Sequence, residues 1–419
     1  MGRPRLVRRF IERGPIDRRA EEALAPIGKR GLSIRERKYL DFSARPVRLL
    51  SASRRKRFQF SSAGVPRMKA ARYHGVGDIR FEDIPEPIAG PGQVKVRVHF
   101  NGLCGSDLHE YFHAPMMAPI TPHPLTGVSV PVILGHEFSG EIVEIGSEVD
   151  GLSVGDAVAV EPTVNCRRCP ACLDGSYNLC SSIAAVGYSW AGGGGLGQYA
   201  VVDADHVYRL PDGMSTREGA LIEPLAVALH AVRRGDVAPG SSVAVHGAGP
   251  IGIGVFLALR AIGVEDITVI EPSAARRAAI EAVGATNVID PNETDVVAEL
   301  RAHTDGAGVA RSFETAGVQA TFLNAVRSTA RHGRVVVVAV HQKPVEFNPT
   351  EILFSECEIV GSIAYCRDYP ETIEFMARGA YPLDSWVQTI AFEDLITDGF
   401  GPLRDQTAIK ILVDMTAVG

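Results

Sequence analysis

Alternating apolar and polar residues mark a strand where the regular pattern of the chain begins. From residue 93, apolar and polar side chains follow one another in the order Val94, Lys95, Val96, Arg97, Val98, His99 and Phe100. Successive side chains of a strand point to opposite faces, so this alternation predicts a half-buried strand. Short β-rich segments separated by glycine and proline continue to about residue 215. They predict an antiparallel, partly closed β domain.

The pattern of predicted elements along the chain changes after about residue 216. A strand at Ser242–His246 is followed by a glycine-rich turn, an apolar helix at Ile251–Ile262 and a second strand at Asp266–Ile270. Strands that alternate with helices predict an α/β fold with a parallel, doubly wound sheet. The continuously apolar strand Val335–Val340 fits a sheet that helices cover on both faces.

The length of the chain suits two domains rather than one core, because 419 residues exceed the usual size of a single domain. We predict a β domain over residues 68–215, with a small lobe at about 161–182. A nucleotide-binding domain is expected over residues 216–365. Residues 366–419 are expected to return to the β domain.

A basic segment precedes the predicted domains. Residues 1–67 carry 19 lysines and arginines against 6 acidic residues, whereas the whole chain has a net charge of −6. We interpret this segment as a disordered or artefactual extension, with folding that begins at Met68. The alternative is a functional basic arm, which would suit nucleic acid or a membrane surface. The acidic remainder of the chain argues against nucleic-acid binding elsewhere.

Composition indicates a globular protein without a membrane segment. Apolar residues make up 46% of the chain and charged residues 22%. No run approaches the roughly 18 uninterrupted apolar residues of a membrane helix. Of the seven cysteines, several cluster at CxxC spacing in a chain without a secretory signal. This pattern favours metal binding over disulfides and predicts a cytoplasmic location.

A glycine-rich motif directly follows the first strand of the predicted parallel sheet. The run Gly247-Ala248-Gly249-Pro250-Ile251-Gly252 has the spacing G-x-G-x-x-G and opens a helix. The first glycine permits a tight turn, the second lets the backbone approach a pyrophosphate, and the third lets helix and strand pack closely. The helix N-terminus supplies free N–H groups for the phosphates. The motif therefore predicts a dinucleotide site; a plain turn of another Rossmann-like domain is the alternative.

Glu271 ends the second strand of this unit. A carboxylate at that position can bind the ribose hydroxyls of adenosine and repel a 2′-phosphate, which favours NAD(H) as the cofactor. Arg276 and Arg277 follow closely and keep NADP(H) open as the alternative.

Four cysteines are spaced C-x2-C-x2-C-x7-C, at Cys166, Cys169, Cys172 and Cys180. Four thiolates on one small loop close a tetrahedral site and leave no open position, which predicts a structural zinc. An iron–sulfur cluster is the alternative, because its motifs also use this spacing.

A second set of metal-binding residue types is dispersed along the chain. It comprises Cys104 in the run Cys104-Gly105-Ser106-Asp107, then Gly135-His136-Glu137, and then Glu223-Pro224. Cysteine, histidine and a carboxylate are a plausible three-ligand set for zinc, with the fourth position left for water or a substrate oxygen. This pattern is typical of a catalytic metal.

Together and in this order, these motifs resemble those of the zinc-containing medium-chain alcohol dehydrogenases, from about Met68 to the C-terminus. The stretches Pro131–Glu137, Glu271–Ser273 and Gly361–Tyr365 look like the butanediol dehydrogenase branch, near the sorbitol dehydrogenases. The basic extension has no counterpart in the family's pattern. The resemblance implies a GroES-like β domain, a Rossmann domain, and a homodimer or homotetramer.

The resemblance also implies two zinc ions per chain and assigns roles to single residues. Cys104 and His136 bind the catalytic zinc with a glutamate as the third ligand. We slightly favour Glu223 over Glu137 as this ligand, and expect the other glutamate to lie directly behind the ligands. Ser106 accepts the proton of the alcohol hydroxyl. His109 passes it toward solvent or the ribose, unless it is an ordinary surface histidine.

The expected reaction is the NAD-linked oxidation of a small secondary alcohol or vicinal diol, 2,3-butanediol to acetoin, and its reverse. A sorbitol (polyol) or threonine dehydrogenase that uses the same residues is one alternative. A non-enzymatic cofactor-binding protein is another. Such a protein should have lost its catalytic ligands, and here all of them are present.

Overall fold

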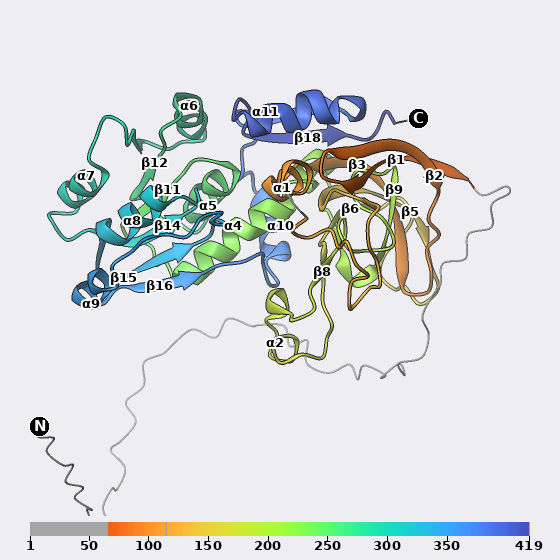
Figure 1. The fold of residues 1–419 in the computed structure, drawn as a ribbon, viewed down its shortest axis with the longest axis horizontal. Helices are drawn as coiled ribbons and strands as arrows, with labels where there is room; N and C mark the ends of the chain where they lie inside the picture. Colours follow the sequence, from red (N-terminus) through yellow and green to blue (C-terminus); the bar gives the residue numbers. More distant parts are fainter. Residues whose placement is uncertain (1–65, 114, 419) are drawn as a thin grey trace, which may run out of the picture. The chain divides into compact units, whose positions relative to one another are not determined.

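The computed structural model describes residues 66–113 and 115–418. The interpretation of residues 1–67 as an extension lies outside the described residues for positions 1–65, and β1 begins at Arg67, one residue before the predicted start at Met68. Within the described part, a large, mainly antiparallel sheet and a large parallel sheet contain most of the strands (Figure 1). Together they confirm the predicted fold class.

The antiparallel sheet contains the strand that the alternating pattern predicts. Its order is β10-β6-β5-β3-β18-β17, and β9 also pairs with β3. The pairings are antiparallel except that of β17 with β18, which is parallel. The strands are β3 (Gln93–Gly102), β5 (Glu137–Ile145), β6 (Ala157–Val160), β9 (Tyr199–Asp203), β10 (Val207–Arg209), β17 (Val387–Ala391) and β18 (Lys410–Asp414). Val94, Val96 and Val98 of β3 are buried, as the alternation predicts. The last two strands come from the C-terminal segment and place it beside β3.

Shorter elements surround this sheet. Three strands form a second sheet: β1 (Arg67–Gly75), β2 (Asp78–Pro85) and β4 (Val132–Ile133). A two-stranded pair, β7 (Thr163–Val164) and β8 (Ala184–Ala185), flanks a lobe that contains α2 (Pro170–Leu173) and the 3-10 turn η1 (Tyr177–Leu179). The remaining short helices of this part are α1 (Gly105–Phe112), η2 (Ala204–His206), α3 (Thr216–Gly219), η3 (Phe392–Asp394), the π-helical turn η4 (Leu395–Phe400) and α11 (Gly401–Arg404).

The parallel sheet has the order β13-β12-β11-β14-β15-β16, in which the chain starts at the centre and reverses direction once. Its strands are β11 (Val243–His246), β12 (Ile267–Ile270), β13 (Asn287–Ile289), β14 (Val309–Glu314), β15 (Thr329–Val337) and β16 (Glu358–Gly361). Every pairing within it is parallel. The strand predicted at Val335–Val340 begins earlier, at Thr329, and ends at Val337. Beyond its end, the N–H groups of Val338 and Ala339 both donate to Glu314 O.

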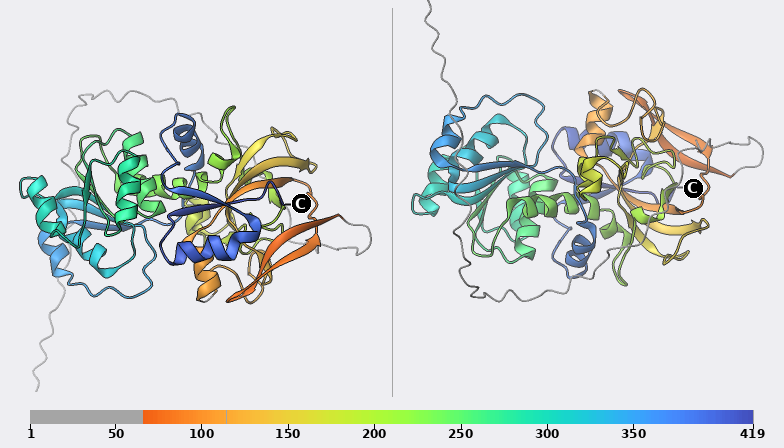
Figure 2. Two further views of the ribbon diagram at one scale, coloured as in Figure 1. Left: turned by 90° about the horizontal axis from the view of Figure 1, so that it is seen from above. Right: turned by 90° about the horizontal axis from the view of Figure 1, so that it is seen from below.

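Helices cover both faces of this sheet (Figure 2). They are α4 (Ile222–Gly235), α5 (Pro250–Ala261), α6 (Ala274–Ala282), α7 (Val296–His303), α8 (Gln319–Ser328), α9 (Thr350–Ser355) and α10 (Tyr369–Ala377). Val243 and Val245 of β11 belong to a buried cluster that includes residues of α4, α5, α6 and α10. Ala244 points the other way and packs with residues of α7. Opposite faces of one apolar strand are thus both buried, which is the doubly wound arrangement.

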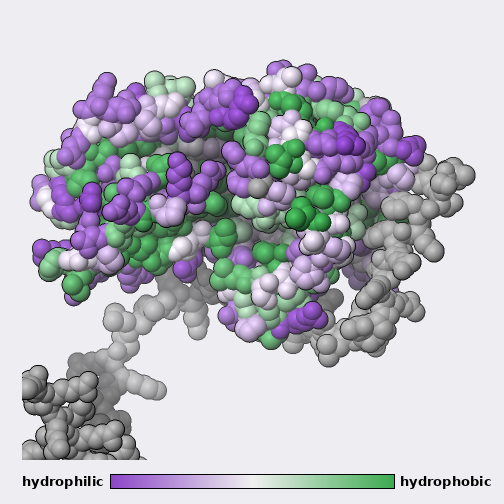
Figure 3. Space-filling model, viewed as in Figure 1, coloured by the Kyte–Doolittle hydropathy of each residue, from purple (hydrophilic) through white to green (hydrophobic). Residues whose placement is uncertain are grey.

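None of the helices in the described part of the chain is long and apolar enough to cross a membrane. Hydrophilic and hydrophobic residues are interspersed over the face shown in Figure 3.

Candidate active site

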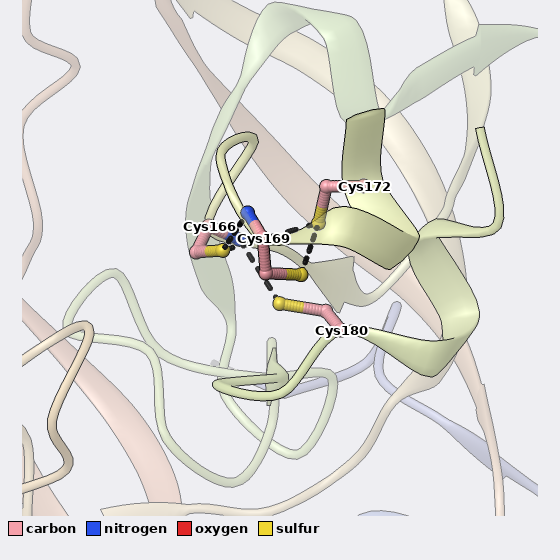
Figure 4. A group of neighbouring side chains, drawn as sticks. All are labelled: Cys166, Cys169, Cys172 and Cys180. Carbon is pink, nitrogen blue, oxygen red and sulfur yellow. Dashed lines mark hydrogen bonds between the residues drawn. The ribbon is translucent and has the colours of Figure 1, made fainter. Parts of the chain in front are cut away.

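The four clustered cysteines converge in the lobe between β7 and β8. Their sulfur atoms turn toward one another (Figure 4) and lie within 4.8 Å of each other. The Sγ atoms of Cys169 and Cys172 are 3.4 Å apart, and those of Cys166 and Cys172 are 3.9 Å apart. All seven cysteines of the chain are free thiols. Sulfur ligands placed in this way fit a closed tetrahedral zinc site.

Backbone N–H groups donate to sulfur atoms of this cluster and lower the pKa of Cys166 and Cys169. Cys166 N donates to Cys180 Sγ, and Cys169 N donates to Cys166 Sγ, each at 3.3 Å. The N–H of Ser181 lowers the pKa of Cys169 to about 6, whereas burial raises the pKa of Cys172 to about 12. A divalent cation would bind these cysteines as thiolates, and the backbone N–H groups would support that form.

The pairing of β3 with β5 brings the second group of candidate metal ligands together. Gly102, near the end of β3, lies opposite Glu137 at the start of β5. Cys104 follows two residues after Gly102 and precedes α1, and His136 directly precedes β5. This register brings one ligand atom each of Cys104, His136 and Glu137 within 4.8 Å of one another. A thiolate, an imidazole and a carboxylate are donors that zinc prefers.

Glu223 reaches the same centre from the first turn of α4 and is 8% exposed. Burial raises the pKa of its carboxyl to about 7. His136 lowers that pKa and Glu137 raises it, so both lie near this carboxylate. Its oxygens lie outside the compact three-residue group. The structure therefore brings all four predicted residues to one place, with Glu137 nearest to Cys104 and His136.

Lys410 was not recognised from the sequence. It comes from β18, is 1% exposed, and donates from Nζ to Glu137 Oε2 and to Leu103 O, the latter at 3.0 Å. Burial acts to lower the pKa of this ammonium, but the carboxylate of Glu137 and its neighbours raise it above its usual value. A positive charge thus stands directly behind one of the two candidate glutamates. The only sign of it in the sequence is one lysine that opens an apolar strand.

Asp107 lies behind the candidate ligands and is fully buried. Its Oδ2 accepts from Cys104 N at 3.0 Å, and its Oδ1 accepts from Tyr188 Oη at 2.8 Å and lies 3.5 Å from His136 Nδ1. Burial acts to raise the pKa of Asp107, but the charge of His136 holds it below its usual value. A carboxylate behind a histidine ligand fixes the orientation of the imidazole ring. Asp107 belongs to the Cys104–Asp107 run of the sequence, but its contacts with Tyr188 and His136 could be recognised only in the structure.

The two residues predicted for proton transfer lie on α1. The hydroxyl groups of Ser106 and Tyr188 are 2.9 Å apart, so Ser106 belongs to the same hydrogen-bond network as Asp107. His109 lies one turn further along this helix, and its Nδ1 is buried without a hydrogen-bond partner in the described residues. The structure records no hydrogen bond between Ser106 and His109 within those residues.

The glycine-rich turn has the shape that its motif predicts. Gly247 adopts φ of +111°, a conformation that favours glycine. A Cβ on Gly252 would lie 1.9 Å from Gly247 O, whereas a Cβ on Gly249 would meet nothing within 4 Å. The first and third glycines are thus required by the fold itself. The space at Gly249, just before α5, leaves room for a phosphate to approach the helix N-terminus.

Glu271 is anchored to this turn. Its Oε2 accepts from Ala248 N at 2.7 Å and its Oε1 accepts from Ser273 N at 2.9 Å. Arg277 donates to the carbonyl of Glu271 at 3.0 Å and pairs with Asp290 at 2.8 Å. Each carboxylate oxygen keeps further lone pairs that can accept from ribose hydroxyls. The guanidinium of Arg277 therefore already has a hydrogen bond and an ion pair. Arg276, by contrast, has a buried Nε without a hydrogen-bond partner in the described residues.

Comparisons with known proteins agree with this geometry. Residues 90–212 match the alcohol dehydrogenase GroES-like domain, and residues 250–378 match the zinc-binding dehydrogenase family. The (R,R)-butanediol dehydrogenase of Bacillus subtilis (strain 168) is 43% identical over 350 residues, which cover 83% of this chain and 99% of the relative. The chain therefore belongs to the zinc-containing medium-chain alcohol dehydrogenases, and it is an oxidoreductase that uses zinc and a nicotinamide dinucleotide. The predicted family and enzyme class are confirmed.

Within this family, the similarity extends to particular branches. The crystal structure of the 2R,3R-butanediol dehydrogenase from Bacillus subtilis superposes with a TM-score of 0.78 and covers 83% of this chain and 99% of its own. A sorbitol dehydrogenase of the same organism is 36% identical and covers 82% of this chain and 93% of its own. A putative zinc-binding dehydrogenase from Sinorhizobium meliloti 1021 bound to NADP has 32% identity and a TM-score of 0.75. The superposition covers 83% of this chain and 99% of that structure's chain.

Proposed function

We propose that this enzyme oxidises a small secondary alcohol or vicinal diol, 2,3-butanediol to acetoin, and catalyses the reverse reduction. The observation that carries the proposal is the 43% identity to a butanediol dehydrogenase over nearly the full length of that relative. The complete set of ligand types around His136 supports it. A polyol such as sorbitol is the second candidate, favoured by the sorbitol dehydrogenase at 36% identity.

The catalytic zinc would be held by Cys104, His136 and one glutamate. Charge pairing favours Glu223, because Glu137 already has Lys410 as its counter-ion and Glu223 has no salt bridge within the described residues. Short distances to Cys104 and His136 favour Glu137. Buried carboxylates need a cation, so we assign the metal to Glu223 and keep Glu137 with Lys410. When bound, zinc supplies Lewis-acid polarisation of the alcohol oxygen.

Proton transfer would begin at Ser106. Its hydroxyl is oriented by Tyr188, whose own hydroxyl is held by the Asp107 carboxylate. An oriented Ser106 Oγ can accept the proton of the substrate hydroxyl and give up its own, which is general acid–base chemistry. His109, one turn along α1, would receive the proton. A bound nicotinamide cofactor would supply the hydride acceptor for the carbinol carbon.

The cofactor would be NAD(H). Gly247, Gly249, Pro250, Ile251 and Gly252 would cradle its pyrophosphate at the start of α5, and Glu271 would bind the adenosine ribose. The ion pair of Arg277 with Asp290 removes one arginine from a 2′-phosphate site and supports this choice. Arg276 is the residue through which NADP(H) would be accommodated instead.

The four-cysteine lobe would hold the second, structural zinc of each chain. We also propose domain limits of 68–215 and 216–365, with a C-terminal segment at 366–419. A homodimer or homotetramer is supported by β16, which is an edge strand, and by Leu353 and Phe354 of α9, which are 70% and 77% exposed. Seven free thiols fit a cytoplasmic location.

Initial rates, measured with protein whose zinc content has been determined, test this proposal. The substrates are the 2,3-butanediol isomers, sorbitol and threonine, each with NAD and with NADP. Fast NAD reduction with a butanediol and two zinc ions per chain is the expected result. Reaction with sorbitol or threonine alone would move the substrate assignment to those alcohols. No turnover at full zinc and cofactor occupancy would overturn the catalytic roles.

A further inference from the structure

A short segment between β16 and α10 connects the four-cysteine lobe to the catalytic centre. This segment, residues 363–368, has Tyr365 in its middle, and that side chain is 1% exposed. The hydroxyl of Tyr365 accepts from Thr163 Oγ1 at 3.4 Å. Burial raises the pKa of the Glu223 carboxyl and the hydroxyl of Tyr365 lowers it, so Tyr365 lies beside Glu223. The segment therefore brings the side chain of Tyr365 close to Glu223.

The lobe is bonded to the same segment at three points. They are Asn178 Nδ2 to Ile363 O at 2.9 Å, Arg367 N to Tyr177 Oη at 2.8 Å, and Cys366 Sγ to Gly175 O at 2.9 Å. Two of these lobe residues belong to η1, which lies between the third and fourth cysteines of the cluster. Closure of the four-cysteine site around a metal would therefore fix the position of both.

Helix α4 holds the segment from its other side. Asp368 is fully buried and accepts from His230 Nδ1 at 3.0 Å and from Cys366 N at 2.8 Å; it also pairs with Arg233. His230 and Arg233 are on the helix whose first turn carries Glu223. Tyr365 and Glu223 are thus held relative to each other by contacts from two directions, of which the lobe provides one.

We infer that the four-cysteine lobe serves the reaction directly, with Asn178 and Tyr177 as positioning residues that hold Tyr365 beside Glu223. This inference rests on the proposed function, because it places Glu223 in the catalytic centre. A lobe that only stabilised the β domain would need no bonds to the segment that carries Tyr365. A small displacement of a group beside the reacting centre lowers catalysis strongly, so loss of one anchor should be measurable.

Asn178→Ala is the first test, and Leu179→Ala is its matched control, because Leu179 lies in the same turn and is 58% exposed. Removing a hydrogen bond of about 1 kcal/mol corresponds to about a fivefold change. We expect about fivefold faster amide exchange in residues 363–368, about fivefold lower kcat/KM for the alcohol, and unchanged zinc content. The control variant should match the parent in all three. Unchanged exchange in residues 363–368 would overturn the inference.

A double-mutant cycle tests the route of the effect. If Asn178 acts through Tyr365, then Asn178→Ala should lower kcat/KM less than twofold in a Tyr365→Phe background, because coupled residues are not additive. Fully additive losses would overturn the inference. Tyr177→Phe is a milder second variant that should speed exchange in the same peptide. If the parent turns over no alcohol, the proposed function fails, but the exchange measurement still tests the coupling between lobe and segment.

Discussion

The ammonium of Lys410 and the carboxylate of Glu137 form an ion pair in the interior of the protein, where their side chains are 2% and 1% exposed. The pair forms because β18 and β5 lie on either side of β3 in the antiparallel sheet. Gly102 of β3 makes room for it, since a Cβ there would lie 2.1 Å from Glu137 Oε2. A buried charge needs a partner, so this pair determines how Glu137 takes part in metal binding.

Lys410→Met should destabilise the protein by about 3–5 kcal/mol, because it leaves the buried Glu137 carboxylate without its counter-ion. The free energy of unfolding in urea measures this loss. The double variant Lys410→Met/Glu137→Gln removes both charges and should recover most of the stability. A double variant as unstable as the single one would show that Lys410 acts through packing rather than through charge.

The identity of the third zinc ligand gives a second prediction. Glu223→Gln should remove a ligand and leave one zinc per chain, together with loss of turnover. Glu137→Gln should keep both zinc ions but weaken the catalytic one about 10- to 100-fold, as changes next to a ligand do. Zinc content during dialysis against a chelator distinguishes them. The reverse order of zinc loss would assign the ligand to Glu137.

Local motifs allowed much of this site to be predicted from the sequence. The glycine-rich turn and the four cysteines each lie within one short stretch, so spacing alone indicated their chemistry. Lys410 and Glu137 are 273 residues apart, and their pairing depends on which strands lie side by side. Tyr188 and Tyr365 were missed for the same reason. Tyrosines in a β-rich region are expected to be core residues, and only the fold shows which of them reach a carboxylate.

Cys104→Ser should abolish alcohol oxidation while leaving NADH binding intact. Cys104 lies before α1 beside His136, whereas the predicted phosphate contacts lie at the turn before α5. Fluorescence titration with NADH and zinc analysis measure the two properties separately. Cys357→Ser, at a buried cysteine that packs among Ala325, Val326 and Val335, is the matched control and should keep its activity. A fully active Cys104→Ser protein without the catalytic zinc would contradict the mechanism.

His246 at the end of β11 gives a prediction about acid stability. The side chain is fully buried, and neither ring nitrogen has a hydrogen-bond partner within the described residues. Glu314 lies opposite it in β14. The Glu314 carboxylate, however, already accepts a hydrogen bond from Ala316 N at 3.0 Å and is hydrogen-bonded to His341 Nε2 at 2.9 Å. Burial therefore lowers the pKa of His246 to about 3, and the folded protein keeps the ring neutral.

The sign of the pH dependence follows from this depressed pKa. Below the usual histidine pKa of about 6.5, the unfolded chain binds a proton at His246 that the folded protein does not bind until about pH 3. The contribution is complete above about pH 6.5 and is lost as the pH falls, at about 1.4 kcal/mol per unit. Between pH 7 and pH 5, the parent should lose about 2 kcal/mol more unfolding free energy than His246→Val. Both proteins keep the same zinc ligands, so metal loss cancels in the difference, and equal slopes would show that the ring is charged or solvated in the folded state.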